Sequence, residues 1–119
     1  MRIQKDEAIR GTLPIAEVVV MGVAGNLPAA TPLQNLAAAR TNTAEQSSTC
    51  FGGGPYKAID GRTSGFWSDK SISHTCSGTG NYLQTVFETP ALVSYVDLYN
   101  RLDSCCSHYL SGATVELLG

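Results

Sequence analysis

Four short segments of the chain show the period-two alternation of a β-strand, and the periodicity of an amphipathic helix is nearly absent. In residues 94–100, Val96 and Leu98 share one face of the predicted strand and the residues beside them share the other. Gly, Pro, Ser and Thr interrupt the chain every few residues, which is typical of short strands joined by loops. The predicted strands are residues 14–21, 82–88, 94–100 and 113–118. Because 119 residues allow a single core, we expect one all-β domain of the sandwich class.

Charge and hydropathy exclude several classes of protein. Charged residues make up 15% of the chain and the net charge is −2, so the clustered Lys and Arg that bind nucleic acid are absent. A hydrophobic content of 43% with so small a net charge predicts a folded chain. The longest apolar run, residues 18–24, is far shorter than the roughly 20 residues that span a bilayer. We therefore expect neither a nucleic-acid partner nor membrane insertion.

The first 22 residues resemble a secretory leader in one respect, because basic residues precede an apolar segment. Pro14 and Glu17 interrupt that segment, however, and its alternation suits a strand that is covered on both faces. We expect residues 1–22 to pack as β-strands. Four cysteines, two of them adjacent, favour an oxidising compartment, which means an extracellular, cell-surface or lumenal location.

Common catalytic signatures are missing from the sequence. It contains no C-x-x-C, H-E-x-x-H, Walker-type glycine loop or G-x-S-x-G. His74 and His108 are its only histidines, and no local pattern joins either of them to a serine and an acid. The sequence therefore predicts a protein that is not an enzyme.

Residues 100–110 combine polar and sulfur-containing side chains directly after a predicted strand. Arg101 precedes Asp103 by two residues, so an ion pair could hold the guanidinium and leave its other donors free for ligand oxygens. A purely structural ion pair is the alternative. Cys105 and Cys106 either pair with the other two cysteines or close on each other in an eight-membered ring. Such a ring beside an arginine would suit a sugar, which has one apolar face and one hydroxylated face.

These residues form a pattern that resembles a known family. Twenty-six residues separate His74 from Arg101, so the chain reads H-x26-R-x-D with a Cys-Cys pair close behind. This is similar to the fucose-binding motif of the F-type lectins, the fucolectin and tachylectin-related group of discoidin-like domains. Further landmarks of that family occur in the family's order at residues 46–49, 58–61, 73–75, 100–103 and 110–113. The resemblance implies an eight-stranded jelly-roll β-sandwich.

By this resemblance, His74 and Arg101 would donate hydrogen bonds to fucose and Asp103 would orient Arg101. A disulfide between Cys105 and Cys106 would pack against the apolar edge of the sugar. No bond would be made or broken, so the implied function is that of a carbohydrate-binding module for fucosylated or related glycans. The landmarks beside the other two cysteines also lead us to expect that Cys50 pairs with Cys76.

The chain departs from the family pattern at the second basic residue. The family has Arg or Lys five residues after the Asp, where this chain has His108. If Ser104 is an insertion, Tyr109 takes that place instead. Either substitution loses a cation, which favours the alternative of a protein-interaction or scaffold sandwich in a larger assembly, with a degenerate sugar site.

A calcium loop is also implied by the resemblance. It maps to Lys57, Asp60, Arg62 and Ser71, and Glu17 would complete the shell. Arg62 stands where the family usually has Asn, so only its backbone carbonyl could serve as a ligand. The alternative is that Asp60 simply begins an Asx turn.

The beginning of the chain resembles the end of the family domain. Residues 1–4 and 13–20 are similar to the R-I-Q and L-x-x-A-E-V patterns of the family's last two strands. Residues 1–22 would therefore either close the same sandwich in permuted order or form the tail of a preceding repeat, in a tandem array or an oligomer. In both cases residues 23–34 are a linker and residues 35–119 form the lectin-like sandwich domain.

Overall fold

The computed structural model describes residues 1–25, 27–28, 30–38, 43–88 and 90–117. In chain order, the strands are β1 (Arg2–Lys5), β2 (Arg10–Gly11), β3 (Pro14–Ile15), β4 (Glu17–Ala24), β5 (Gln34–Asn35), β6 (Thr43–Gln46), β7 (Ser73–His74), β8 (Gly78–Thr79), β9 (Tyr82–Val86), β10 (Ala91–Tyr99) and β11 (Ala113–Glu116). Two short 3-10 helices, η1 (Pro55–Ala58) and η2 (Trp67–Asp69), lie in the long connection between β6 and β7. The described residues contain no α-helix, so the all-β prediction is confirmed.

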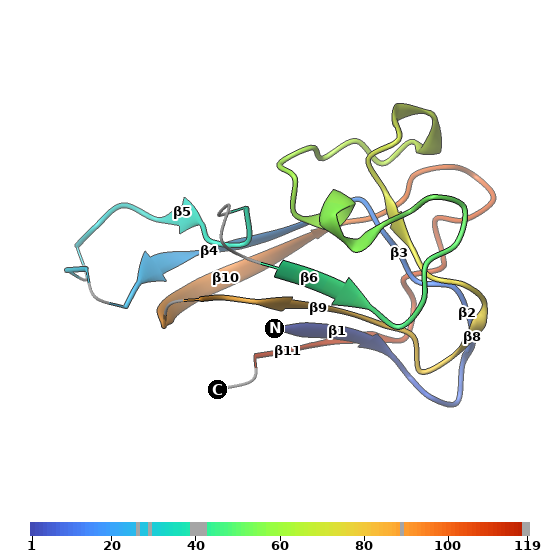
Figure 1. Cartoon of the computed structure of the whole chain (residues 1–119), viewed down its shortest axis with the longest axis horizontal. Helices are drawn as coiled ribbons and strands as arrows, with labels where there is room; N and C mark the ends of the chain where they lie inside the picture. Colours follow the sequence, from blue (N-terminus) through green and yellow to red (C-terminus); the bar gives the residue numbers. More distant parts are fainter. Residues whose placement is uncertain (26, 29, 39–42, 89, 118–119) are drawn as a thin grey trace.

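The strands form antiparallel sheets of different sizes (Figure 1). A four-stranded sheet has the order β11-β1-β9-β6 and a three-stranded sheet has the order β10-β4-β5. Two smaller pairs, β2 with β8 and β3 with β7, join the connections at one end of the molecule. Within the described ranges, no helix is long and apolar enough to cross a membrane.

The four predicted strands are present, with shifted ends. The segment predicted as one strand over residues 14–21 is divided at Ala16, because β3 pairs with β7 whereas β4 pairs with β10 and β5. β4 continues to Ala24, two residues into the predicted linker. β10 begins three residues early and carries an irregularity between Val93 and Tyr95. β9 and β11 end at Val86 and Glu116, and position 118 of the last predicted strand lies outside the described residues.

The first strands of the chain complete both large sheets. β1 lies between β11 and β9, with Ile3 opposite Val115 on one side and Leu83 on the other. β4 lies between β10 and β5. Residues 2–5 and 17–24 are therefore hydrogen-bonded to strands of this same chain, as the β-strand prediction for this segment requires.

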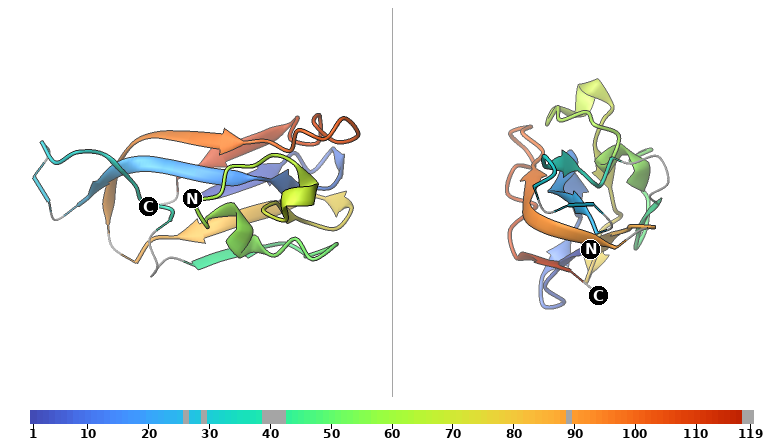
Figure 2. Two further views of the ribbon diagram at one scale, coloured as in Figure 1. Left: turned by 90° about the horizontal axis from the view of Figure 1, so that it is seen from above. Right: turned by 90° about the vertical axis from the view of Figure 1, so that its left-hand side faces the viewer.

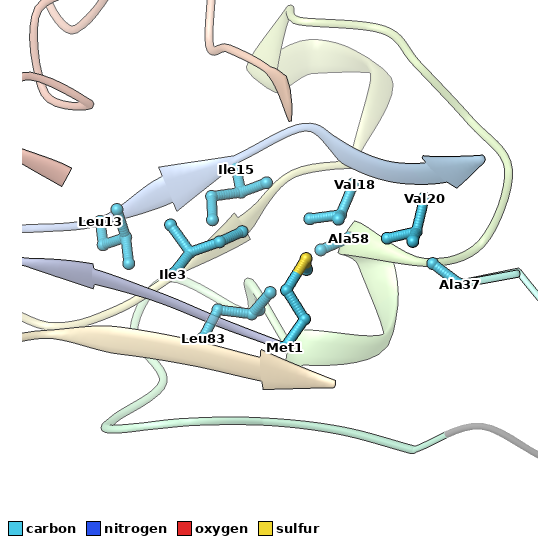
Figure 3. Close-up of a cluster of buried hydrophobic side chains, with 9 residues drawn as sticks. All are labelled: Met1, Ile3, Leu13, Ile15, Val18, Val20, Ala37, Ala58 and Leu83. Atoms are coloured by element: carbon cyan, nitrogen blue, oxygen red, sulfur yellow. The ribbon is translucent and has the colours of Figure 1, made fainter. Parts of the chain in front are cut away.

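One apolar core lies between the strands of the two layers. Figure 3 shows Ile3 and Leu83 on β1 and β9 directed toward Ile15 and Val18 on the opposite layer, and all four are at most 1% exposed. Burying one such side chain stabilises a fold by about 1.5 to 3 kcal/mol. The rest of the cluster consists of Met1, Leu13, Val20, Ala37 and Ala58.

Several connections between strands converge at one end of the molecule. The loop after β10, the β2–β8 pair and the β3–β7 pair gather at one end of the molecule in Figure 1, and the view from above in Figure 2 agrees. These connections come from the beginning, middle and end of the sequence. The convergence creates the candidate site.

Candidate functional site

A cavity of about 530 Å³ opens at this end of the sandwich. Four of its lining residues are among those predicted from the sequence, namely His74, Arg101, Cys106 and Tyr109. The others are Gly11, Thr12, Phe51, Trp67 and Ser77. The site therefore draws on segments from the N-terminal strands, the η1–η2 region and the loop after β10.

His74 forms part of the cavity wall and is only 3% exposed. Its Nδ1 lies 2.7 Å from the carbonyl oxygen of Thr75, which can only accept, so Nδ1 carries the proton. Burial lowers the pKa of His74, with a further lowering from the nearby charge of Arg101. The neutral ring thus presents Nε2 as a hydrogen-bond acceptor, which suits a sugar hydroxyl that donates. The resemblance had implied a donor here.

Two aromatic rings enclose His74. Phe51 and Trp67 each meet its ring edge-on, with centroid distances of 5.3 Å and 5.4 Å. Phe51 is nevertheless 77% exposed, so it stands on the rim of the cavity. Aromatic side chains in this arrangement offer apolar faces to the C–H surface of a ligand.

Arg101 is held on two sides at the end of β10. Its Nε donates to Asp103 Oδ2 at 2.8 Å, and its guanidinium carbon lies 4.8 Å from the centroid of the Trp67 ring. The side chain is 14% exposed, and its terminal nitrogens have no hydrogen-bond partner among the described residues. Fixed in this way, Arg101 has donors available for ligand oxygens.

Asp103 connects Arg101 to the tryptophan loop. Its Oδ2 also accepts from the backbone N–H of Trp67 at 3.0 Å. The hydrogen bond from Arg101, followed by the one from Trp67, holds the pKa of Asp103 below its usual range. Asp103 thus contacts both Arg101 and the segment that carries Trp67.

Both expected disulfide bonds are present, Cys50 with Cys76 and Cys105 with Cys106. Cys106 is buried and lines the cavity, whereas Cys105 is exposed. The Cys50–Cys76 bond anchors the loop that carries Phe51. The N–H of Cys50 also donates to the carbonyl of His74 at 3.1 Å, which ties the same loop to the cavity wall. Two disulfides are compatible with an oxidising compartment.

The loop of residues 104–109 directs Tyr109 to the cavity. Tyr109 is half-buried and lines the wall, whereas His108 is exposed and is not among the lining residues. Their rings meet edge-on at 4.7 Å. Of the two candidates for the place of the family's second basic residue, Tyr109 is thus the one at the cavity.

The sequence analysis missed five of the nine lining residues. Trp67 precedes His74 by seven residues in a connection with no periodic signal, so no sequence pattern marked it. Gly11 and Thr12 reach the site because β2 pairs with β8, with Arg10 opposite Thr79 and Gly11 opposite Gly78. A two-residue pairing between segments almost 70 positions apart leaves no local trace in the sequence.

Among the residues predicted to bind calcium, Glu17 is the one that lies on β4. Glu17 is fully buried on β4, and its Oε2 accepts from the N–H of Gly61 at 2.7 Å. Its Oε1 is buried and has no hydrogen-bond partner among the described residues. Burial, with a smaller contribution from the neighbouring charge of Asp60, raises the pKa of Glu17 to about 8. At neutral pH the Glu17 side chain therefore favours its protonated, uncharged form.

The predicted calcium ligands Asp60, Arg62 and Ser71 form hydrogen bonds within their own segment of the chain. Asp60 Oδ1 accepts from the N–H of Arg62 at 2.9 Å, so the Asx turn is present. The Arg62 side chain donates to the carbonyl of Asp69 at 3.0 Å, and Ser71 Oγ donates to the carbonyl of Ser64 at 3.3 Å.

Lys57 lies half-buried in η1. In the described part of the chain, no three His, Cys, Asp or Glu side chains gather as a metal site. A calcium ion here would therefore take most of its ligands from backbone carbonyls, as calcium often does.

Comparison of the chain with protein-family models, with curated proteins and with solved structures gives no match. A functional assignment therefore depends on the motif and on the geometry of the cavity.

Proposed function

We propose that this chain is a non-catalytic carbohydrate-binding module of the F-type lectin kind, a jelly-roll sandwich that binds a fucose-type sugar in the cavity beside His74. The observation that carries the proposal is the composition of the cavity lining. It combines Cys106 and Trp67 with Arg101, which a hydrogen bond to Asp103 holds in place. An apolar surface beside convergent hydrogen-bonding groups is what a sugar requires.

Each part of the cavity has a separate task in this proposal. Arg101 donates to the ring oxygen or hydroxyls of the sugar, and Nε2 of His74 accepts from a hydroxyl. Trp67, Phe51 and the Cys105–Cys106 pair cover the apolar face and exclude water from these hydrogen bonds, which strengthens them.

A calcium ion would support this site from a distance. The buried Oε1 of Glu17 and the neighbouring Asp60 fit a divalent cation that also takes backbone carbonyls from the loop around Lys57, Arg62 and Ser71. Such an ion would neutralise these carboxylates, and Glu17 and Asp60 would then join β4 to the connection that carries Trp67.

Glycan-array screening followed by calorimetry tests the proposal. Wild-type protein should bind fucosylated glycans, and Arg101→Ala should weaken binding by one to two decades, because hydrogen bonds to a charged group contribute roughly 1.5 to 3 kcal/mol. Arg2→Ala is the matched control, since Arg2 contacts Gln84 and Tyr82 and does not line the cavity. Equal affinities in the wild type and Arg101→Ala would refute the assignment.

A second candidate is a protein-interaction or scaffold sandwich in a larger extracellular, cell-surface or lumenal assembly, with repeated copies or other subunits. The observation that favours it is that Tyr109, a neutral side chain, lines the cavity where the family has a cation. Sugar-independent binding to a partner protein, together with an empty glycan array, would support this candidate over the lectin.

A further inference from the structure

Lys5 is a buried lysine at the end of β1. Alternate residues of this strand face inward, so Lys5 shares the inner face with Ile3 and is only 5% exposed. Lysine is almost never found at such a position without a partner of opposite charge. Its place inside the sandwich therefore calls for a physical reason.

The surroundings of Lys5 leave its ammonium group poorly satisfied. Nζ has three donors, and its one hydrogen bond to the described residues goes to the carbonyl of Thr12 at 3.4 Å. Among the described residues, no carboxylate lies within ion-pair distance of Nζ. Burial accordingly lowers the pKa of Lys5.

The ammonium group lies directly behind the wall of the cavity. Thr12, which accepts its hydrogen bond, is a lining residue, and so is Gly11. A Cβ at Gly11 would lie only 3.2 Å from Nζ, which shows how closely the charge approaches this part of the wall. The hydroxyl oxygen of Thr12 is also buried and has no partner among the described residues. Thr12 therefore joins a lining position of the cavity, through its carbonyl, to an ammonium group with donors to spare.

The charges around the cavity do not balance. Arg101 is paired with Asp103, and the buried His74 ring favours its neutral form. Lys5 adds a positive charge that no carboxylate of the described residues neutralises. An unneutralised positive charge beside the cavity favours a ligand with an anionic group.

We propose that Lys5 is a specificity-determining residue, and that the cavity prefers a sugar carrying an anionic substituent, either a sulfate ester or a carboxylate. This inference rests on the proposed sugar-binding function. It places a second cation beside the cavity, on β1, in addition to Arg101.

Calorimetry with a matched panel of ligands tests this inference. The panel contains a neutral fucoside, the same fucoside carrying a sulfate ester, and a fucosylated glycan with a carboxylate-bearing sugar. Wild-type protein should bind at least one anionic ligand about tenfold or more tighter than the neutral fucoside, and added salt should reduce this preference. Whichever of the two anionic ligands binds more tightly than the neutral fucoside identifies its anionic group, sulfate or carboxylate, as the one that the cavity recognises.

Two variants on the same strand separate charge selection from folding. Lys5→Met keeps an unbranched side chain on the inner face and should abolish the preference while leaving affinity for the neutral fucoside within about twofold. Arg2→Met removes a cation from the outer face and should change neither value. If Lys5→Met does not fold, Lys5→Gln replaces it.

The possible results separate this inference from the proposed function. If wild type binds the neutral fucoside as tightly as both anionic ligands, the role of Lys5 is refuted while the lectin assignment stands. If Lys5→Met retains the preference of the wild type, Lys5 is likewise not its source. If no ligand of the panel binds, the proposed function fails and this inference fails with it.

Discussion

Asp103 accepts two hydrogen bonds on one oxygen, from Arg101 Nε at 2.8 Å and from the backbone N–H of Trp67 at 3.0 Å. One carboxylate thereby fixes both the charged group and the aromatic wall of the cavity. The same contacts hold the pKa of Asp103 below its usual range, so the carboxylate stays ionised under ordinary conditions. Asp103 therefore couples the position of Arg101 to that of the loop that carries Trp67.

Asp103→Asn should therefore weaken sugar binding without unfolding the protein. The amide keeps the shape of the side chain but loses the charge-assisted bond to Arg101, so we expect affinity to fall by about tenfold. Calorimetry measures the affinity and circular dichroism monitors the fold. Asp97→Asn, at an exposed position of β10, removes the same charge away from the cavity and serves as the control. Unchanged affinity in Asp103→Asn would show that Arg101 needs no orienting partner.

Trp67 gives a direct spectroscopic measure of binding, because it is the only tryptophan in the chain. A sugar that packs against its ring should change the intensity or wavelength of its fluorescence in a saturable way. Trp67→Ala should lower affinity by tenfold or more, since it removes the aromatic wall and the stacking surface of Arg101. Phe66→Ala is the matched control, because Phe66 is an exposed aromatic neighbour that does not line the cavity. A glycan that binds with no fluorescence response would bind elsewhere.

The sequence could predict the strands and part of the site for clear physical reasons. Strands that bury one face must alternate, so the pattern in β10 marks Val96 and Leu98 as inward-facing without knowledge of the partner strand. Arg101 and Asp103 were found because their interaction is local and depends only on spacing. Spacing alone left the pairing of Cys105 and Cys106 open, and the resemblance to the F-type lectins favoured the bond that the structure contains.

Long-range pairing explains what the sequence could not predict. Thr12 and Trp67 reach the cavity only because small strand pairs and loops close over the end of the sandwich. Lys5 is different, because its place in the alternation of β1 already put it on the face of Ile3. The alternation of a strand over residues 2–5 is enough to predict that Lys5 faces inward, which is unusual for a lysine. Its position behind the cavity could not be predicted, because it depends on long-range contacts.

Glu17 should make stability depend on pH in the absence of calcium. Its pKa is raised to about 8 in the folded protein, against roughly 4.3 for a free glutamate, so the folded state binds the proton more tightly than the unfolded state. Stability should consequently fall as pH rises from about 4.3 to about 8. Thermal unfolding in chelator measures this fall, and a domain of this size loses roughly 4 °C in Tm per kcal/mol.

The same experiment tests the calcium proposal. Calcium binds the ionised carboxylate, so it should raise Tm at pH 8 and have less effect at pH 5. Glu17→Gln should remove most of the pH dependence and the response to calcium together. A calcium response that persists in Glu17→Gln would assign the ion to another site.

The two disulfides should differ in what they contribute. The Cys50–Cys76 bond closes a loop with a sequence separation of 26, so its removal as the double serine variant should cost about 3 to 4 kcal/mol of stability. The Cys105–Cys106 bond joins neighbours and encloses no intervening residues, so the corresponding double serine variant should unfold at nearly the wild-type temperature. Because Cys106 lines the cavity, that variant should instead lose sugar affinity. Thermal unfolding and calorimetry on both variants decide the matter, each variant serving as the control for the other. Equal losses of stability, or a Cys105–Cys106 variant that binds sugar normally, would contradict a binding role for the adjacent pair.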